Sequence, residues 1–251
     1  MLIANNISYT IGSKTILRDV SFTLEPGEFK AVVGPNGAGK SSLLKIVVGE
    51  NKSYTGNVYY HGKLLKTLGV KEISKLRAVL PQESQVNFPF TVQEIVEMGR
   101  TIFRDTKSHL DKVVDEAMKG TGIMSFRERN YHTLSGGEKQ KVQLTRVMAQ
   151  IWDSNDFSKF IFLDEPTASL DMAQQHQILG LAKQLCEKNV GIFAVIHDLN
   201  LAAQYADNLM FVKKGEVICQ GPVKEVMNKQ NIEKTFDHEV TIAFDEVNEI
   251  P

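Results

Sequence analysis

The sequence predicts an α/β fold in which a mainly parallel sheet is covered on both faces. Three observations support this prediction. Short apolar runs of strand length alternate with helical runs over much of the 251 residues. A glycine-rich loop joins one strand to a helix, and a later apolar strand ends in two acidic residues. An acid pair in that position emerges at the carboxyl edge of the sheet, where open α/β folds bind their ligands.

The first third of the chain contains four predicted strands. They are apolar or alternating in polarity, and the turn signals Pro26-Gly27 and His61-Gly62 separate some of them. These strands are expected at Ile16–Leu24, Phe29–Val33, Val58–Tyr60 and Leu76–Leu80.

The middle of the chain is predicted to be a helical insert, roughly Gln85 to Arg146. Thr91 to Glu94 has the form of a capping box that starts a helix, and Ser108 to Asp111 has the same form. Gly120 and Gly122 are expected to stop the second helix. A third helix is expected at Glu138–Ile151.

Strands return after the insert and complete the alternating pattern. They are predicted at Phe160–Leu163, Gly191–Ile196 and Asn208–Val212, with a helical run at Met172–Glu187 between the first two. The last stretch, Phe236 to Pro251, is acidic and weakly patterned. An added strand and a loose tail are both compatible with it.

The composition excludes several classes of protein. Lys and Arg number 29 and Asp and Glu 30, so no global charge favours nucleic acid or acidic lipid as a partner. The two cysteines, Cys186 and Cys219, have no metal-ligand spacing and suit a reducing compartment. No stretch approaches the ~20 apolar residues that cross a bilayer, and the start does not resemble a secretory signal. We therefore expect a chain that is neither secreted nor membrane-spanning.

A phosphate-binding loop is the strongest motif. It follows a predicted strand, opens into a helical run at Ser42–Val48 and matches G-x-x-x-x-G-K-[ST]. Its residues are Gly34, Pro35, Asn36, Gly37, Ala38, Gly39, Lys40 and Ser41. The glycines let backbone N–H groups point inward, and Lys40 is expected to neutralise β- and γ-phosphate charge. We expect Ser41 to ligate Mg²⁺ and Ser42 to donate to the α-phosphate.

The phosphate loop indicates a catalytic role for the acidic pair at the end of Phe160–Leu163. Asp164 is expected to hold Mg²⁺ through water. Glu165 then stands beyond the metal, where it can orient or deprotonate the water that attacks the γ-phosphate. Alone, a pair of acids at the end of a strand would more often be a solvated surface feature.

A second glycine motif carries a resemblance to a known family. Leu134-Ser135-Gly136-Gly137-Glu138-Lys139-Gln140 resembles the signature sequence of the ABC ATPases. Ser135, Gly136 and Gly137 form an anion-binding nest at a helix start, suited to a γ-phosphate that approaches from the opposite side. The family usually has Gln where this chain has Glu138. The resemblance implies a P-loop NTPase (RecA-like) core with an antiparallel β subdomain and an inserted α-helical subdomain, in a single nucleotide-binding domain, residues 1–251.

Other family motifs follow in the expected order. Gln82 resembles the glutamine that touches Mg²⁺ and links the core to the insert, and His197 resembles the histidine that contacts the γ-phosphate. Asp171 lies in a segment that resembles the loop crossing the dimer interface. Tyr9 resembles the aromatic residue that stacks on adenine, although half-buried packing would also explain it.

By the same resemblance, ATP lies between the phosphate loop of one subunit and the signature of another, so a homodimer is expected. The insert then transmits movement to integral membrane permease subunits docked in a groove near Gln82 and Phe88-Pro89-Phe90. The resemblance also implies a peripheral position at the cytoplasmic face of the inner membrane and an indirect link to a periplasmic substrate-binding protein.

Three longer stretches resemble ATPases of the iron-chelate, vitamin B12 and haem importer group, the haem importers most closely. They are residues 76–82, 87–100 and 197–207. Ferric siderophore and cobalamin remain alternative cargoes. A soluble ABC ATPase of iron-sulfur assembly remains an alternative function, and a nucleotide-gated module without turnover is disfavoured by Glu165 and His197.

Overall fold

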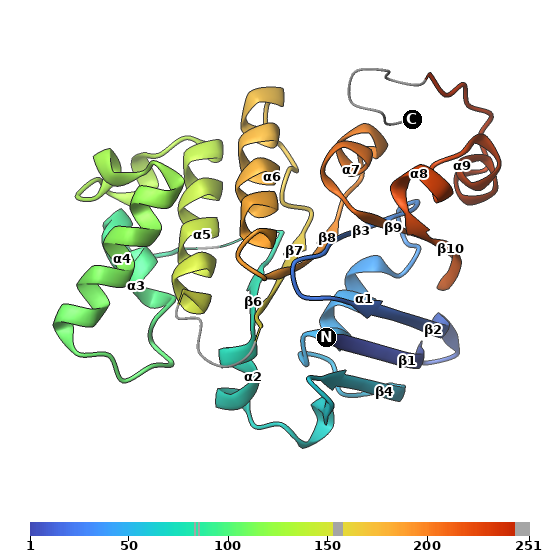
Figure 1. Cartoon of the computed structure of the whole chain (residues 1–251), viewed down its shortest axis with the longest axis horizontal. Coiled ribbons are helices and arrows are strands. Elements are labelled where there is room, and N and C mark those ends of the chain that lie inside the picture. Colours follow the sequence, from blue (N-terminus) through green and yellow to red (C-terminus); the bar gives the residue numbers. More distant parts are fainter. Residues whose placement is uncertain (83, 85, 153–157, 244–251) are drawn as a thin grey trace.

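The computed structural model describes residues 1–82, 84, 86–152 and 158–243, whose strands form two sheets beside a helical region (Figure 1). The larger sheet has six strands in the order β10-β9-β3-β8-β7-β6. Its members are β3 (Phe29–Val33), β6 (Arg77–Leu80), β7 (Phe160–Asp164), β8 (Gly191–Val195), β9 (Asn208–Lys213) and β10 (Glu216–Pro222). The five strands from β9 to β6 run parallel, and β10 runs antiparallel to β9.

The central strands of this sheet are buried on both faces. Every residue of β3, β7 and β8 is buried, as expected of apolar strands in a parallel sheet that is covered on both sides. The predicted strand Phe29–Val33 is confirmed to the residue. The predicted strand at Leu76 was wrong by one residue, because Leu76 is the last residue of α2 (Val70–Leu76).

One face of the larger sheet is covered by a second, antiparallel sheet and by α1 (Lys40–Val47). The second sheet has the order β2-β1-β4-β5. Its strands are β1 (Leu2–Ile11), β2 (Lys14–Leu24), β4 (Thr55–Tyr60) and β5 (Lys63–Leu64). Leu17, Leu43 and Phe193 lie in the shared core, which joins both sheets to α1. The antiparallel subdomain that the resemblance implied is therefore present.

The other face is covered by helices. Leu144, Leu179 and Leu201 pack in one core with alternate residues of β3, β7 and β8. The helices that contribute to this core are α5 (Gly136–Ile151), α6 (Met172–Cys186), α7 (Leu199–Tyr205), α8 (Val223–Val226) and α9 (Lys229–Phe236). The prediction that both faces of the sheet are covered is thus confirmed, although helices dominate only one of them.

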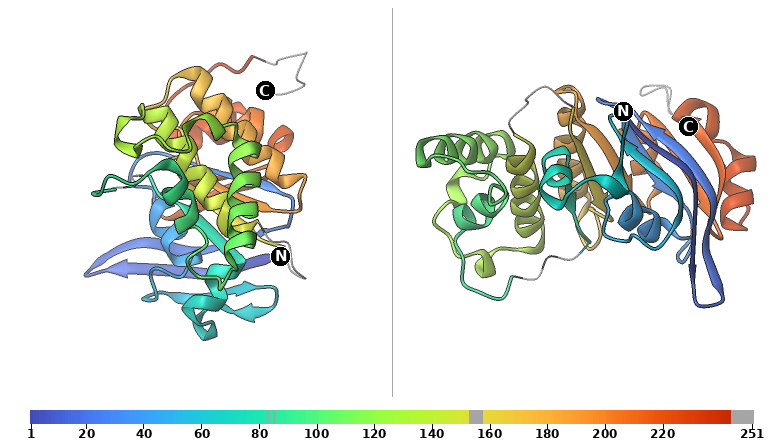
Figure 2. Two further views of the ribbon diagram at one scale, coloured as in Figure 1. Left: turned by 90° about the vertical axis from the view of Figure 1, so that its left-hand side faces the viewer. Right: turned by 90° about the horizontal axis from the view of Figure 1, so that it is seen from below.

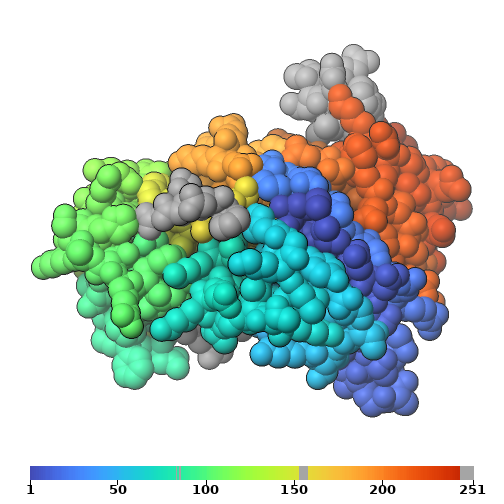
Figure 3. Space-filling model, turned by 60° about the horizontal axis from the view of Figure 1, so that its bottom comes forward, coloured from blue at the N-terminus to red at the C-terminus, as the bar shows by residue number. Residues whose placement is uncertain are grey.

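The helical insert forms one end of the molecule (Figures 1 and 3). Val96, Val114 and Val142 lie in a separate core that this region builds for itself. The insert contains α3 (Val92–Met98), α4 (Lys107–Thr121), the 3₁₀ turns Met124–Phe126 and Tyr131–Thr133, and most of α5. Figure 2 shows the insert at the opposite end from the antiparallel sheet and the C-terminal helices.

The predicted helix starts were partly correct. Thr91 caps α3 in a capping box with Glu94, as the sequence indicated. The predicted box at Ser108 was wrong. Thr106 caps α4, because its hydroxyl oxygen accepts the N–H of His109, and Ser108 lies inside the helix. Gly120 lies inside α4, and the left-handed Gly122 ends that helix.

The remaining differences concern boundaries. The third helix of the insert begins at Gly136, two residues before the predicted Glu138, and continues to Ile151. Gln85, the expected start of the insert, lies outside the described residues, as does the tail from residue 244 onward. Residues 237–243 form no regular element. Within the ranges that the structure describes, no helix is both long enough and apolar enough to span a bilayer.

Candidate nucleotide site

Four neighbouring parallel strands bring most of the predicted site residues to one edge of the larger sheet. In the order β3-β8-β7-β6, all four strands end at this edge. β3 leads into the phosphate loop, β8 into His197, β7 into Glu165 and β6 into Gln82. These residues are far apart in the chain, and the strand order is what assembles them.

The phosphate loop depends on glycine where the backbone passes close to other segments. Gly34 has φ 153°, and a Cβ atom at this position would lie 2.0 Å from the carbonyl oxygen of Val212 in β9. Gly39, with φ 103°, caps α1, and a Cβ atom there would lie 2.9 Å from the carbonyl oxygen of Ile16. The loop is therefore wedged between β9 and β2 at positions that only glycine fits.

Lys40 is folded into this loop. Its Nζ atom donates to the carbonyl oxygens of Gly34 at 2.7 Å and Pro35 at 3.0 Å. Burial lowers the pKa of Lys40, and the neighbouring carboxylates of Glu165 and Asp164 oppose this effect. The ammonium group is therefore held at the loop by weak neutral acceptors, which a phosphate oxygen can replace.

Ser41, in the first turn of α1, contacts Asp164, the last residue of β7. The Ser41 hydroxyl donates to Oδ1 of Asp164 at 3.2 Å. Burial raises the pKa of Asp164, the hydroxyl of Ser41 lowers it, and the charge of Glu165 raises it further. The ionised form of Asp164 is therefore destabilised in the absence of a cation, and a bound cation would stabilise it.

Glu165 connects three strand ends. His197 Nε2 lies 2.7 Å from Glu165 Oε1, and Gln82 Nε2 donates to Glu165 Oε2 at 2.8 Å. Both carboxylate oxygens thus have a fixed partner. Glu165 itself has φ 50°, a conformation that costs a non-glycine residue about 1–3 kcal/mol and is frequent at functional sites.

The signature residues lie at the start of α5. Ser135 caps the helix: its Oγ accepts the N–H of Glu138 at 3.3 Å, and the N–H of Ser135 donates to Glu138 Oε2 at 2.7 Å. The hydroxyl of Ser135 also hydrogen-bonds to the Glu138 carboxylate and lowers its pKa. Gly136 and Ser135 are exposed. Glu138 contributes to the cap as Gln would, so the departure from the family pattern preserves the local structure.

One residue near the signature was missed by sequence reasoning. Arg129 Nη1 lies 3.3 Å from Glu138 Oε1, which pairs a cation with the signature acid. Arg129 precedes Ser135 by six residues and lies in a loop, so no helical or strand spacing predicted that it would face Glu138.

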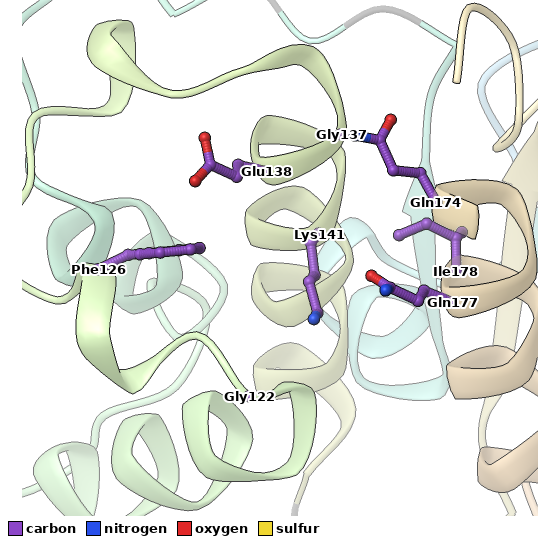
Figure 4. A pocket seen from close by; sticks show the side chains of 8 residues that line it. All are labelled: Gly122, Phe126, Gly137, Glu138, Lys141, Gln174, Gln177 and Ile178. Carbon is purple, nitrogen blue, oxygen red and sulfur yellow. The ribbon is translucent and has the colours of Figure 1, made fainter. Parts of the chain in front are cut away.

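The start of α6 packs against the signature. Asp171 caps α6 by accepting the N–H of Gln174 at 2.8 Å. The Gln174 side chain covers Gly137, where a Cβ atom would lie 2.2 Å from it. A pocket of ≈ 160 Å³ is lined by both helices and by Gly122 and Phe126, and Lys141 projects into it (Figure 4).

The structure does not bring all the predicted residues together. α5 packs on α3, α4, α6 and β6, whereas α1 packs on β2 and β7. In Figure 1 the two helices lie on opposite sides of α6. The signature and the phosphate loop of one chain therefore belong to different parts of its surface. Tyr9, on β1, is half-buried and packs against the core shared by the two sheets.

A strand that leads through a glycine-rich loop into α1, with an acidic pair two strands away, defines a P-loop ATPase. A sequence model of the ABC transporter family matches residues 17–168, and the chain belongs to this family.

Two relatives are called hemin import ATP-binding proteins. The one from Methylobacillus flagellatus is 40% identical and covers 94% of this chain and 89% of its own length. The one from Gloeobacter violaceus is 45% identical and covers 94% and 87%. A solved ATP-binding cassette, a dimer in a post-hydrolysis state with ADP and Pi, is 26% identical, with a TM-score of 0.75 over 88% of this chain and 98% of that one. The predicted fold and the prediction of an ATP-hydrolysing transporter subunit are confirmed.

Proposed function

We propose that two copies of this chain bind two ATP molecules between them and hydrolyse ATP to drive an importer, with haem as the cargo. The observation that carries the proposal is the position of Glu165. It is fixed by Gln82 and His197 at the same sheet edge as the phosphate loop. The whole chain acts as one nucleotide-binding domain, with the helical subdomain at roughly residues 85–146.

The triphosphate binds over the phosphate loop. Backbone N–H groups of the loop and of the start of α1 face its oxygens, and Lys40 exchanges its carbonyl partners for β- and γ-phosphate. Ser42, in the first turn of α1, donates to the α-phosphate. Tyr9 stacks on the adenine with the exposed part of its ring.

The residues around Ser41 fit Mg²⁺. A hydroxyl and a carboxylate in contact are oxygen ligands of the kind this ion prefers, and Mg²⁺ usually binds few protein groups together with phosphate. Ser41 and Gln82 would hold the ion directly and Asp164 through water. When bound, Mg²⁺ neutralises charge that develops on the phosphates.

Glu165 is the proposed general base. A carboxylate fixed on both oxygens presents a lone pair in a constant direction, which suits it to orient the attacking water and accept its proton. His197, 42% exposed, contacts the γ-phosphate. Gln82 connects this centre with the segment that leads to the insert.

The second half of each site comes from the partner subunit. Ser135 and Gly136 offer a hydroxyl and an N–H group at an exposed helix start. Gly137 follows them under the Gln174 side chain, and Asp171 caps the helix that carries Gln174. The separation of this surface from the phosphate loop within one chain supports a homodimer. ATP closes the dimer, and hydrolysis allows it to reopen.

The permease docks on the insert near Gln82. Phe88 is 66% exposed, and its carbonyl oxygen is 3.0 Å from His132 Nε2, which holds this aromatic segment on the surface of the insert. Such a position places the chain at the cytoplasmic face of the inner membrane. The chain does not touch the cargo, which a periplasmic binding protein delivers to the permease.

Haem is supported by the relatives, which are 36–45% identical and carry hemin import in their names. The test is haem-dependent growth of a strain that lacks its haem importer ATPase, complemented with this chain and its neighbouring permease genes. Growth with wild type and not with Glu165→Gln supports the proposal. Growth on ferric siderophore or cobalamin alone would reassign the cargo, and recovery of only soluble scaffold proteins on purification would reassign the function to iron-sulfur assembly.

A further inference from the structure

The acid in the signature loop creates an electrostatic problem for the proposed site. Glu138 is an acid in the first turn of α5, the helix start that receives the γ-phosphate in the proposed dimer. Hydrogen bonds from the backbone N–H and the hydroxyl of Ser135, and then the charge of Arg129, lower the pKa of Glu138. The residue is thus a carboxylate at neutral pH, and it carries a negative charge where a triphosphate must approach.

Arg129 is held in a position that offsets this charge. Its Nη1 atom lies 3.3 Å from Glu138 Oε1, and its guanidinium lies 5.0 Å from the centre of the Phe126 ring. Its backbone is fixed as well, since Val92 N–H donates to its carbonyl oxygen at 3.0 Å. Figure 4 shows Glu138 projecting from α5 on the side away from α6, and the three side chains of α6 that line the same pocket, Gln174, Gln177 and Ile178, carry no charge.

The pair contributes little to folding stability. The side chains of Arg129 and Glu138 are 43% and 30% exposed, and exposed ion pairs stabilise proteins very little because water and salt screen them. The cap itself requires only an acceptor at residue 138, which Gln also supplies. A purely structural role therefore does not explain why Arg129 faces this residue.

We infer that Arg129 is a positioning residue for ATP: it neutralises Glu138 and holds the Ser135 cap, so that the signature can accept the partner's γ-phosphate. This inference rests on the proposed function, because it requires that the signature binds ATP in trans. It assigns the compensation for an acidic signature to a residue outside the motif.

The test compares Arg129→Gln, Arg129→Lys, Glu138→Gln and the double variant Arg129→Gln/Glu138→Gln in steady-state ATP hydrolysis. Arg129→Gln is expected to raise KM for ATP roughly 10-fold with kcat retained, since like charges then face each other uncompensated. Arg129→Lys keeps the charge and is expected to retain a KM near that of wild type. The double variant is expected to return KM to that of Glu138→Gln, because the carboxylate that requires compensation is gone.

An unchanged KM in Arg129→Gln, or a double variant as impaired as the single one, would overturn the inference. A structural role predicts the second pattern, since removing Glu138 cannot restore a damaged loop. Ser135→Arg, measured in parallel, distinguishes a failure of the proposed trans site from a failure of the role of Arg129. If it hydrolyses ATP like wild type, the proposed trans site has failed; if it is inactive while Arg129→Gln is normal, only the role of Arg129 has failed.

Discussion

Nε2 of His197 lies 2.7 Å from Oε1 of Glu165, and this contact joins the ends of two adjacent strands at the sheet edge. With Gln82 on the other oxygen, the Glu165 carboxylate cannot rotate without losing a partner. The direction of the proposed base is thus set by residues that follow β6 and β8 as well as by its own strand, β7.

Replacing Glu165 tests the base. Glu165→Gln keeps the shape and the hydrogen-bonding capacity of the side chain but cannot accept a proton. We expect kcat to fall roughly 100-fold or more, the usual scale for loss of a general base, with ATP affinity retained. Phosphate release and fluorescent ATP binding measure the two quantities. Glu187→Gln, at the exposed end of α6, is the control and should have wild-type turnover; normal turnover in Glu165→Gln would remove that residue from its role.

Replacing Asp164 should separate stability from function. Burial raises the pKa of Asp164. Without a bound cation, the ionised carboxylate therefore lowers the free energy of unfolding at pH values above that pKa. This loss of stability disappears as the pH falls through that pKa toward 3.8. Asp164→Asn lacks this cost. We expect its Tm without nucleotide to rise by about 2–4 °C, the shift that ~1 kcal/mol produces in a chain of this size.

The same variant should lose the further rise in Tm that Mg²⁺ and ATP give the wild type, because the carboxylate near Ser41 is absent. Thermal scans at neutral pH with and without Mg²⁺ and ATP measure both effects. A Tm of Asp164→Asn below that of wild type, both without nucleotide, would show that the Asp164 carboxylate stabilises the protein even without a cation.

Two glycines of the phosphate loop should differ in their tolerance of alanine. In Gly34→Ala the new Cβ meets the backbone of Val212, and the positive φ adds strain. A loss of roughly 3 kcal/mol or more is expected. Gly37 has φ 76° and open space around it, so Gly37→Ala should lose only about 1–2 kcal/mol. Urea unfolding compares them, and equal losses would contradict the close approach of the loop to β9.

Tyr9 tests the adenine site. Tyr9→Ala should weaken ATP binding about 10-fold, within the ~1–3 kcal/mol that stacking of a base on an aromatic ring contributes. Tyr9→Phe keeps the ring and should bind like wild type. Because Tyr9 also packs against the core, the Tm of each variant is the control for folding. Equal ATP affinity in Tyr9→Ala and wild type would show that the ring of Tyr9 packs against the core and does not bind adenine.

Much of the fold could be predicted because local signals were strong. The buried run Phe29–Val33 and the glycine loop after it identified the centre of the larger sheet. β1 was missed because its exposed and buried residues do not alternate regularly, and its pairing with β2 and β4 contains bulges. Short helices such as α2 and α8 were missed because tertiary packing determines them more than helix propensity does.

The site was predicted wherever a motif joined chemistry to a strand end. Asp164 and Glu165 follow a buried strand, so their position at the sheet edge could be foreseen. Their partners could not be derived from spacing, because strand order decides that β8 and β6 flank β7. Arg129 was also missed, because its contact with Glu138 arises from the path of a loop.

The molar mass of Glu165→Gln in solution, measured by light scattering with and without ATP, tests whether ATP holds two copies of the chain together. We expect 28.1 kDa without nucleotide and twice that mass with saturating ATP and Mg²⁺. Ser135→Arg in the same background should remain at 28.1 kDa, because its signature can no longer receive a phosphate. A mass of 28.1 kDa in saturating ATP, from a chain whose wild type hydrolyses ATP at full rate, would show that hydrolysis does not require two copies of the chain to close on ATP.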